Sequence, residues 1–135
     1  MSGIILLADL AQRWPIEVDR TFACALWTGR KDKRDGRALV WRGKTPTAAQ
    51  RAVYEAEVRP IPEGMELDHA CRRPQCVAPH HAEPVTRAEN ERRKSWRRRA
   101  RQTTCPRGHD MQLNAATTPE GGRTCRVCNR EALGL

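Results

Sequence analysis

The chain has few aromatic residues and no long hydrophobic run. Of its 135 residues, 4% are aromatic and 39% are hydrophobic in all. A domain with so little apolar material usually needs metal ions or disulfides to stabilise its core. The segment "IILLA" near the start is too short to span a bilayer, and no export signal opens the chain. We therefore expect a cytoplasmic protein with no membrane partner, in a compartment that keeps thiols reduced.

The chain has six cysteines, and most of them lie at short spacings from another cysteine or a histidine. In a reducing compartment such spacings are typical of metal ligands. The tail holds Cys105-x3-His109 and Cys125-x2-Cys128, separated by the turn "EGGR". Zn²⁺ prefers four nitrogen or sulfur ligands in a tetrahedron, and two such pairs on a hairpin supply them. A closed, structural zinc site is therefore predicted in the tail.

A second set of ligands lies in "LDHACRRPQCVAPHHAEPVTRAEN", which contains Cys71-x4-Cys76-x4-His81. A tetrahedral site needs a fourth ligand, and both His69 and Cys24 are candidates. His69 would lie on the same side of a strand as Cys71. Counting favours Cys24, because six cysteines with His81 and His109 complete two sets of four. His69 is then free for chemistry, and His80 is expected to be a surface histidine of the loop.

Positive charge is concentrated in the second half of the chain. The formal net charge is +9, of which residues 1–68 contribute +1 and residues 69–135 contribute +8. A basic surface beside metal ligands favours a nucleic-acid partner. A helix is predicted over 87–101, opened by a capping box of Thr86 and Glu89. It contains eight Lys or Arg residues.

The remaining patterns predict short strands around Cys24, in "RALVW" and in "MELDHAC", and a helix that begins at Pro46 with Thr45 as its N-cap. Trp27 and Trp41 are expected in the core. We predict an α+β fold: an N-terminal arm over 1–20, which is expected to hold a helical turn or a strand, a zinc-stapled domain over 21–101, and a zinc knuckle over 102–135.

The spacing His69-x-Cys71-x4-Cys76-x4-His81-x8-Asn90 resembles that of the His-Cys box homing endonucleases. More broadly it resembles the HNH, or ββα-metal, nucleases of phages and mobile introns. The resemblance covers about residues 22 to 130, since "CALWTG", "QRAVYE" and "CPRGH…CRVC" are also similar to segments of these proteins. It implies a DNA endonuclease with a ββα-metal fold.

The resemblance also implies roles for individual residues. His69 would be the general base, Asn90 and Asp68 would hold one catalytic Mg²⁺ or Mn²⁺, and Arg51 would contact a phosphate. Cys24, Cys71, Cys76 and His81 would hold a structural zinc. Phosphate contacts are expected from the basic helix, at Arg87, Arg93, Lys94, Arg97, Arg98 and Arg101. Base-reading residues are expected on a hairpin over 30–44.

Two positions depart from the family pattern. Ala78 stands where these nucleases carry an Asn that braces the loop, and Ala82 stands where they carry Leu. Ala78 favours an alternative, a zinc-stapled DNA-binding protein without catalysis. Both alternatives stay open here, as do the monomeric and homodimeric states.

Overall fold

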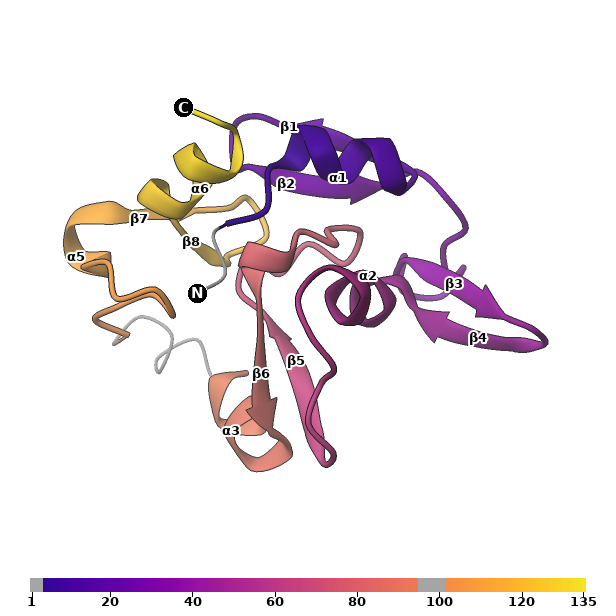
Figure 1. Ribbon diagram of the computed structural model, residues 1–135. Helices are drawn as coiled ribbons and strands as arrows, with labels where there is room; N and C mark the ends of the chain where they lie inside the picture. Colours follow the sequence, from indigo (N-terminus) through magenta and orange to yellow (C-terminus); the bar gives the residue numbers. More distant parts are fainter. Residues whose placement is uncertain (1–3, 95–101) are drawn as a thin grey trace.

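A computed structural model describes residues 4–94 and 102–135 of the chain (Figure 1). No helix in these two ranges is long and apolar enough to cross a membrane. The elements, in chain order, are α1 (Leu7–Arg13), β1 (Ile16–Asp19), β2 (Cys24–Trp27), β3 (Leu39–Arg42), β4 (Thr45–Ala48), α2 (Ala49–Glu57), β5 (Met65–His69), η1 (Pro79–His81), β6 (Ala82–Thr86), α3 (Arg87–Arg93), α5 (Met111–Asn114), β7 (Ala115–Thr117), β8 (Arg123–Cys125) and α6 (Arg126–Ala132). The prediction of a mixed α and β domain is confirmed.

The strands of the described residues form four separate antiparallel pairs, β1–β2, β3–β4, β5–β6 and β7–β8. A two-stranded sheet is marginally stable by itself, so these pairs depend on what packs against them. The cysteines Cys24, Cys71 and Cys76 are fully buried in one core with Leu10 and Val53. Thiols therefore occupy positions that large apolar side chains fill in other small domains.

Residues 4–20 supply both a helix and a strand to this core. Leu7 and Leu10 of α1 are buried at 1% and 0% exposure. β1 pairs with β2 from Ile16 opposite Trp27 to Asp19 opposite Cys24. The segment therefore packs directly against the strand that carries a predicted zinc ligand.

The predicted start of the second helix is wrong. Thr45 and Pro46 belong to strand β4, where they lie opposite Arg42 and Trp41. The reason is the turn before them: Gly43 has a φ of 61°, a left-handed conformation that glycine adopts without strain and that reverses the chain into a hairpin. The helix α2 begins only at Ala49 and buries the face formed by Ala49, Ala52, Val53 and Tyr54.

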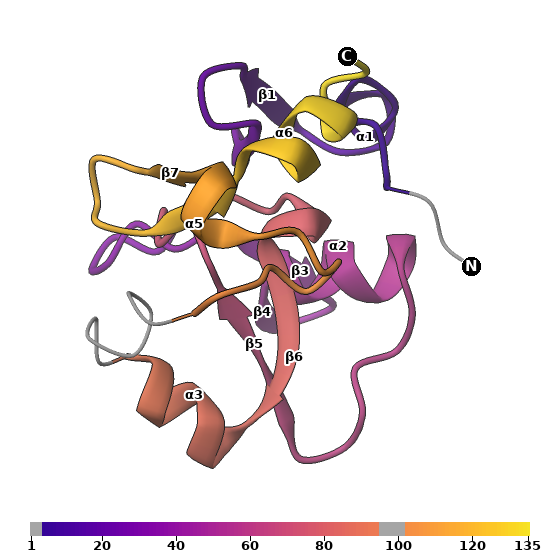
Figure 2. The ribbon, with the colours of Figure 1, turned by 90° about the vertical axis from the view of Figure 1, so that its left-hand side faces the viewer.

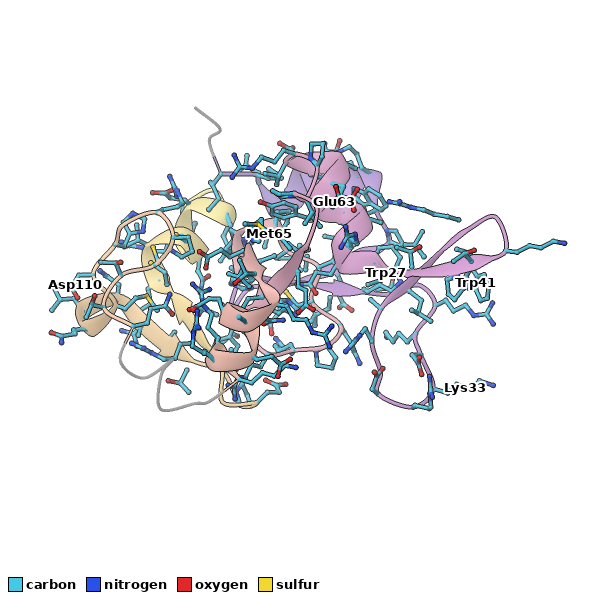
Figure 3. The ribbon with its side chains drawn as sticks, turned by 90° about the horizontal axis from the view of Figure 1, so that it is seen from below. Trp27, Lys33, Trp41, Glu63, Met65 and Asp110 are labelled. Carbon is cyan, nitrogen blue, oxygen red and sulfur yellow. The ribbon has the colours of Figure 1, made fainter. Side chains whose placement is uncertain are left out.

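The β3–β4 hairpin projects away from the rest of the molecule (Figure 1). Its Trp41 is 44% exposed, so the prediction that this residue lies in the core is wrong. The guanidinium of Arg30 lies 4.9 Å from the centre of the Trp41 ring. Trp27, on β2, is 4% exposed, and its place in the core is confirmed. Figure 3 shows Trp41 and Lys33 at the outer end of the molecule and Trp27 nearer its body.

The β5–β6 pair leads directly into α3. Thr86 caps this helix, because its Oγ1 accepts a hydrogen bond from the amide of Glu89 at 3.1 Å. The reciprocal half of the expected capping box is wrong, since the Glu89 carboxylate accepts hydrogen bonds from Arg92 and Arg93 instead. α3 is described to Arg93 with Lys94 as its C-cap, and the rest of the predicted helix lies outside the described residues.

The C-terminal segment forms a small ribbon of α5, β7, β8 and α6. In Figure 2 this ribbon lies above β6, and α6 approaches α1. Ala132 of α6 is fully buried in the core that contains Leu7 and Leu10. The two ends of the chain therefore share one core.

Candidate metal clusters and nuclease site

Four ligand side chains from separate elements meet in the first cluster. The ligand atoms of Cys24, Cys71, Cys76 and His81 lie within 4.8 Å of one another, and all four residues are buried. The Nδ1 atom of His81 lies 3.7 Å from the Cys24 sulfur and 3.6 Å from the Cys76 sulfur. Three thiols and one imidazole are the donor set that Zn²⁺ prefers, and the residues present therefore fit this ion.

The electrostatics of this cluster agree with a cation site. Burial acts to lower the pKa of His81, but the Cys24 and Cys71 sulfurs outweigh it and raise the pKa to about 10. Hydrogen bonds from Cys24 and Cys76 lower the pKa of Cys71, whereas burial raises that of Cys76. The shifts thus pair one thiolate with one imidazolium inside the cluster. A divalent cation would displace the remaining protons, because thiols and imidazoles bind metals in their deprotonated forms.

The structure includes Cys24 in the first set of four, as the count of ligands favoured. His69 is not one of the four, although its Nε2 atom lies 3.5 Å from the Cys71 sulfur. His69 is the last residue of β5, and Cys71 lies in the turn that follows it, two positions along the chain. His69 is therefore a neighbour of the cluster.

The second cluster has the same composition. The ligand atoms of Cys105, His109, Cys125 and Cys128 also lie within 4.8 Å of one another. The Nδ1 atom of His109 is 3.3 Å from the Cys105 sulfur and 3.4 Å from each of the other two. The structure describes all six cysteines of the chain, and none of them forms a disulfide. Both predicted clusters could thus hold zinc.

Carboxylates gather where α3 packs on the β5–β6 pair. Asp68 and Glu83 lie opposite each other in register. Nη1 of Arg93 is 3.2 Å from an Asp68 oxygen and 2.6 Å from a Glu83 oxygen, and its Nε is 3.1 Å from Glu89. Asn90 donates a hydrogen bond to Glu66 at 2.6 Å. The oxygen donors are of the kind that Mg²⁺ binds.

The structure thus brings Asp68 and Asn90 to the same face, through Arg93 and Glu66. His69 follows Asp68 on the strand and contacts Cys71. Glu66 and Glu83 were missed by the sequence reasoning. The alternation of Glu66 and Asp68 along one strand was readable, but the pairing of Asp68 with Glu83 depends on the hairpin register.

The predicted phosphate-contacting residues have different environments. Arg51 lies on α2 with 45% of its side chain exposed, and its Nε is 2.9 Å from Glu55. Arg87 is exposed, and Nζ of Lys94 is 2.7 Å from Glu91. Arg93 is turned toward the carboxylates, as described above. Arg97, Arg98 and Arg101 lie outside the described residues.

His80 is not the surface histidine that we expected. Both its ring nitrogens are buried, and its ring centroid lies 4.0 Å from that of His81. Burial and the charge of His81 lower the pKa of His80 well below its usual value, so the ring is neutral. The cause is the η1 turn, in which Ala78 is fully buried and Pro79 and His81 pack inward.

A cleft of about 600 Å³ separates the carboxylate face from the second cluster. Asp68, Glu83 and Arg93 line one part of it, and Cys105 and Arg107 line another. Its lining thus contains both acidic and basic groups, beside the position where β5 ends.

Comparison with known families matches residues 47–92 to a model described as HNH endonuclease. The matched segment runs from β4 to α3 and contains Asp68, His69 and Asn90. No curated protein and no solved structure matches the chain significantly. The match covers less than half of the chain and supports an HNH nuclease, which is a hydrolase.

Proposed function

We propose that the protein is a Mg²⁺-dependent DNA endonuclease of homing or phage type. The observation that carries this proposal is the match of residues 47–92 to the HNH family on a β5–β6–α3 unit that holds Asp68, His69 and Asn90. The substrate is a phosphodiester of DNA, and the products carry 5′-phosphate and 3′-hydroxyl ends.

In this proposal His69 accepts the proton of the attacking water. A neutral imidazole can do so near pH 7, and its position at the end of β5 leaves it half-buried. Asp68 and Asn90 provide oxygen ligands for the catalytic cation, which when bound neutralises charge on the phosphoryl oxygens. Arg93 is the counterion of Asp68 and Glu83. Its hydrogen bond to Asp68 must break before the Asp68 carboxylate can bind a cation.

Both Cys/His clusters hold structural zinc in this proposal. Each set of four ligands is closed, so neither leaves a position for substrate. The first zinc fixes the loop between β5 and β6, and the second fixes the C-terminal ribbon.

The proposed DNA contacts come from two elements. The β3–β4 hairpin projects from the body and has exposed Arg42 and Lys44 at its turn, and a two-stranded ribbon fits the major groove. The basic segment that begins at Arg87 contributes phosphate contacts.

A second candidate is a DNA-binding protein without catalysis. It is favoured by the position of Arg93, whose guanidinium bonds the carboxylates of Asp68 and Glu83. In this arrangement Arg93 takes the place that a cation bound to Asp68 would need. Ala78, which stands where the resembling nucleases carry an Asn, is fully buried and has no polar group in its own side chain to brace the loop.

Incubation of the purified protein with supercoiled plasmid, with added Mg²⁺ or in a buffer free of Mg²⁺, tests both candidates. The endonuclease proposal expects nicked or linear DNA only with Mg²⁺. Replacement of His69 by Ala should reduce cleavage by about 10²–10⁴ while DNA binding and zinc content stay unchanged. Tight binding by the wild type with no cleavage under Mg²⁺ or Mn²⁺ would support the non-catalytic candidate.

A further inference from the structure

The imidazole of His81 is held on both sides. Its Nδ1 atom faces the thiols of the first cluster, and its Nε2 atom lies 3.0 Å from Oδ1 of Asn129. Asn129 in turn donates from Nδ2 to Oγ1 of Thr124 at 3.0 Å. Because Nδ2 is committed to Thr124, Oδ1 is left to accept the Nε2 proton of His81. A cation at the metal position would displace the proton from Nδ1, and the lone pair left there would face it.

Both members of this bridge are direct chain neighbours of ligands in the second cluster. Asn129 follows Cys128 in α6, and Thr124 precedes Cys125 at the end of β8. Asn129 and Thr124 are 6% and 2% exposed, so water does not replace their contacts. The geometry of the second cluster therefore sets where the acceptor for His81 lies.

The ribbon also contacts the first cluster through the backbone. Oγ1 of Thr118 donates to the carbonyl of Cys71 at 2.9 Å, and the amide of Arg123 donates to the carbonyl of Ala70 at 3.1 Å. A Cβ atom at Gly122 would lie 2.4 Å from the Cys71 carbonyl carbon and oxygen. Only glycine allows this approach, so the turn of the ribbon is built to rest on Cys71.

From these contacts we propose that the C-terminal ribbon clamps the first metal cluster, with Asn129 as the positioning residue, and that the two clusters bind zinc cooperatively. The inference rests on the zinc occupancy proposed above and is independent of DNA cleavage. Groups that orient a metal-ligating histidine typically contribute 10–100-fold to metal affinity. Coupling between two binding sites is reciprocal, so each zinc should strengthen the other by the same factor.

The clamp acts beside the proposed general base. Ala70 and Cys71, which the ribbon holds, follow His69 directly at the end of β5. Loss of the second zinc should therefore loosen the strand end that positions His69, even though no ligand of the second cluster contacts it.

The test is a competition between the protein and a chromophoric zinc chelator, after elemental analysis of the wild type. Asn129→Ala removes the acceptor and keeps all eight ligands, so it should weaken the first zinc 10–100-fold. Asn129→Asp keeps an oxygen that accepts from His81 and should restore much of this loss. Gln112→Ala, an exposed change in the same ribbon, is the control and should leave both zincs unchanged.

A double-mutant cycle tests the coupling itself. Cys105→Ser disables the second cluster at a position away from Asn129, and it should weaken the first zinc to the same extent as Asn129→Ala. Combining both changes should add little, because they break the same connection. Cys24→Ser, which disables the first cluster, should weaken the second zinc by the same factor.

The outcomes separate the inference from its premise. The clamp would be overturned if Asn129→Ala left the zinc affinities unchanged, as Gln112→Ala should. It would also be overturned if the double variant lost affinity by the full product of the two single-variant factors. Fewer than two zincs in the wild type would overturn the proposed occupancy. Intact coupling in a protein that never cleaves DNA would support the clamp and contradict only the proposed nuclease activity.

Discussion

At the scale of single residues, Arg93 is the side chain whose role changes most between sequence and structure. Its place in a basic helix predicts contact with DNA phosphate. In the structure its side chain is 22% exposed and bonds Asp68, Glu83 and Glu89. Burial acts to lower the pKa of Arg93, but Glu83 and the other two carboxylates outweigh it and raise it. Arg93 is therefore a structural counterion before any cation binds.

We predict that Arg93→Ala lowers the free energy of unfolding by about 1–3 kcal/mol, the scale of a lost hydrogen bond to a charged group. Asp68 and Glu83, which lie opposite each other in register, would then lose this shared guanidinium, whereas Glu89 keeps Arg92. Millimolar Mg²⁺ should restore part of the loss, and thermal melts with and without Mg²⁺ measure both effects. The control is Arg92→Ala, whose side chain is 53% exposed and pairs with Glu89. Equal melting temperatures for the two variants would contradict this role.

The sequence was sufficient to predict which Cys and His residues gather in two clusters, because their spacings and their total number carry that information. It was not sufficient for Glu83 or His80. Glu83 reaches Asp68 only through the register of β5 and β6, and His80 is buried because η1 turns its ring against His81. These features depend on pairing and packing between segments, which local spacing does not encode.

At the scale of elements, the β3–β4 hairpin projects from the body of the fold (Figure 1). The sequence predicted the strand "RALVW" but not its partner, because "TPTA" has the composition of a helix start. The left-handed Gly43 makes the hairpin possible. An exposed Trp41 with Arg30 over its ring stands among basic side chains, an arrangement suited to DNA contact.

We predict that Arg42→Ala combined with Lys44→Ala weakens binding to all DNA sequences alike. The slope of log K against log salt should fall by about 0.9 for each lost phosphate contact. Fluorescence anisotropy with labelled duplexes over a range of salt measures it. Arg130→Ala, an exposed change on α6, should leave the slope unchanged. A hairpin variant with the wild-type slope would place the DNA elsewhere on the molecule.

At the scale of the whole molecule, the N-terminal helix is part of the core. Leu10 is fully buried beside Trp27 and Ala132, which come from β2 and α6. We predict that Leu10→Ala lowers the free energy of unfolding by about 2–5 kcal/mol, as for other buried leucines. Denaturant titration measures the change. Leu113→Ala, at a residue that is 77% exposed, is the control and should cost almost nothing.

The same core makes the whole fold dependent on metal. The described strands form only two-stranded sheets, and the apolar core is small and built around Cys24, Cys71 and Cys76. If the proposed zinc is removed, the folding free energy that its binding contributes is lost, and four polar groups stay buried in the core. We predict that a strong chelator under reducing conditions abolishes the cooperative thermal transition, and that added Zn²⁺ restores it. Circular dichroism and calorimetry measure the loss and the recovery. A chelated protein shown by elemental analysis to be free of zinc, yet melting at the wild-type temperature, would show that packing alone holds the four strand pairs together.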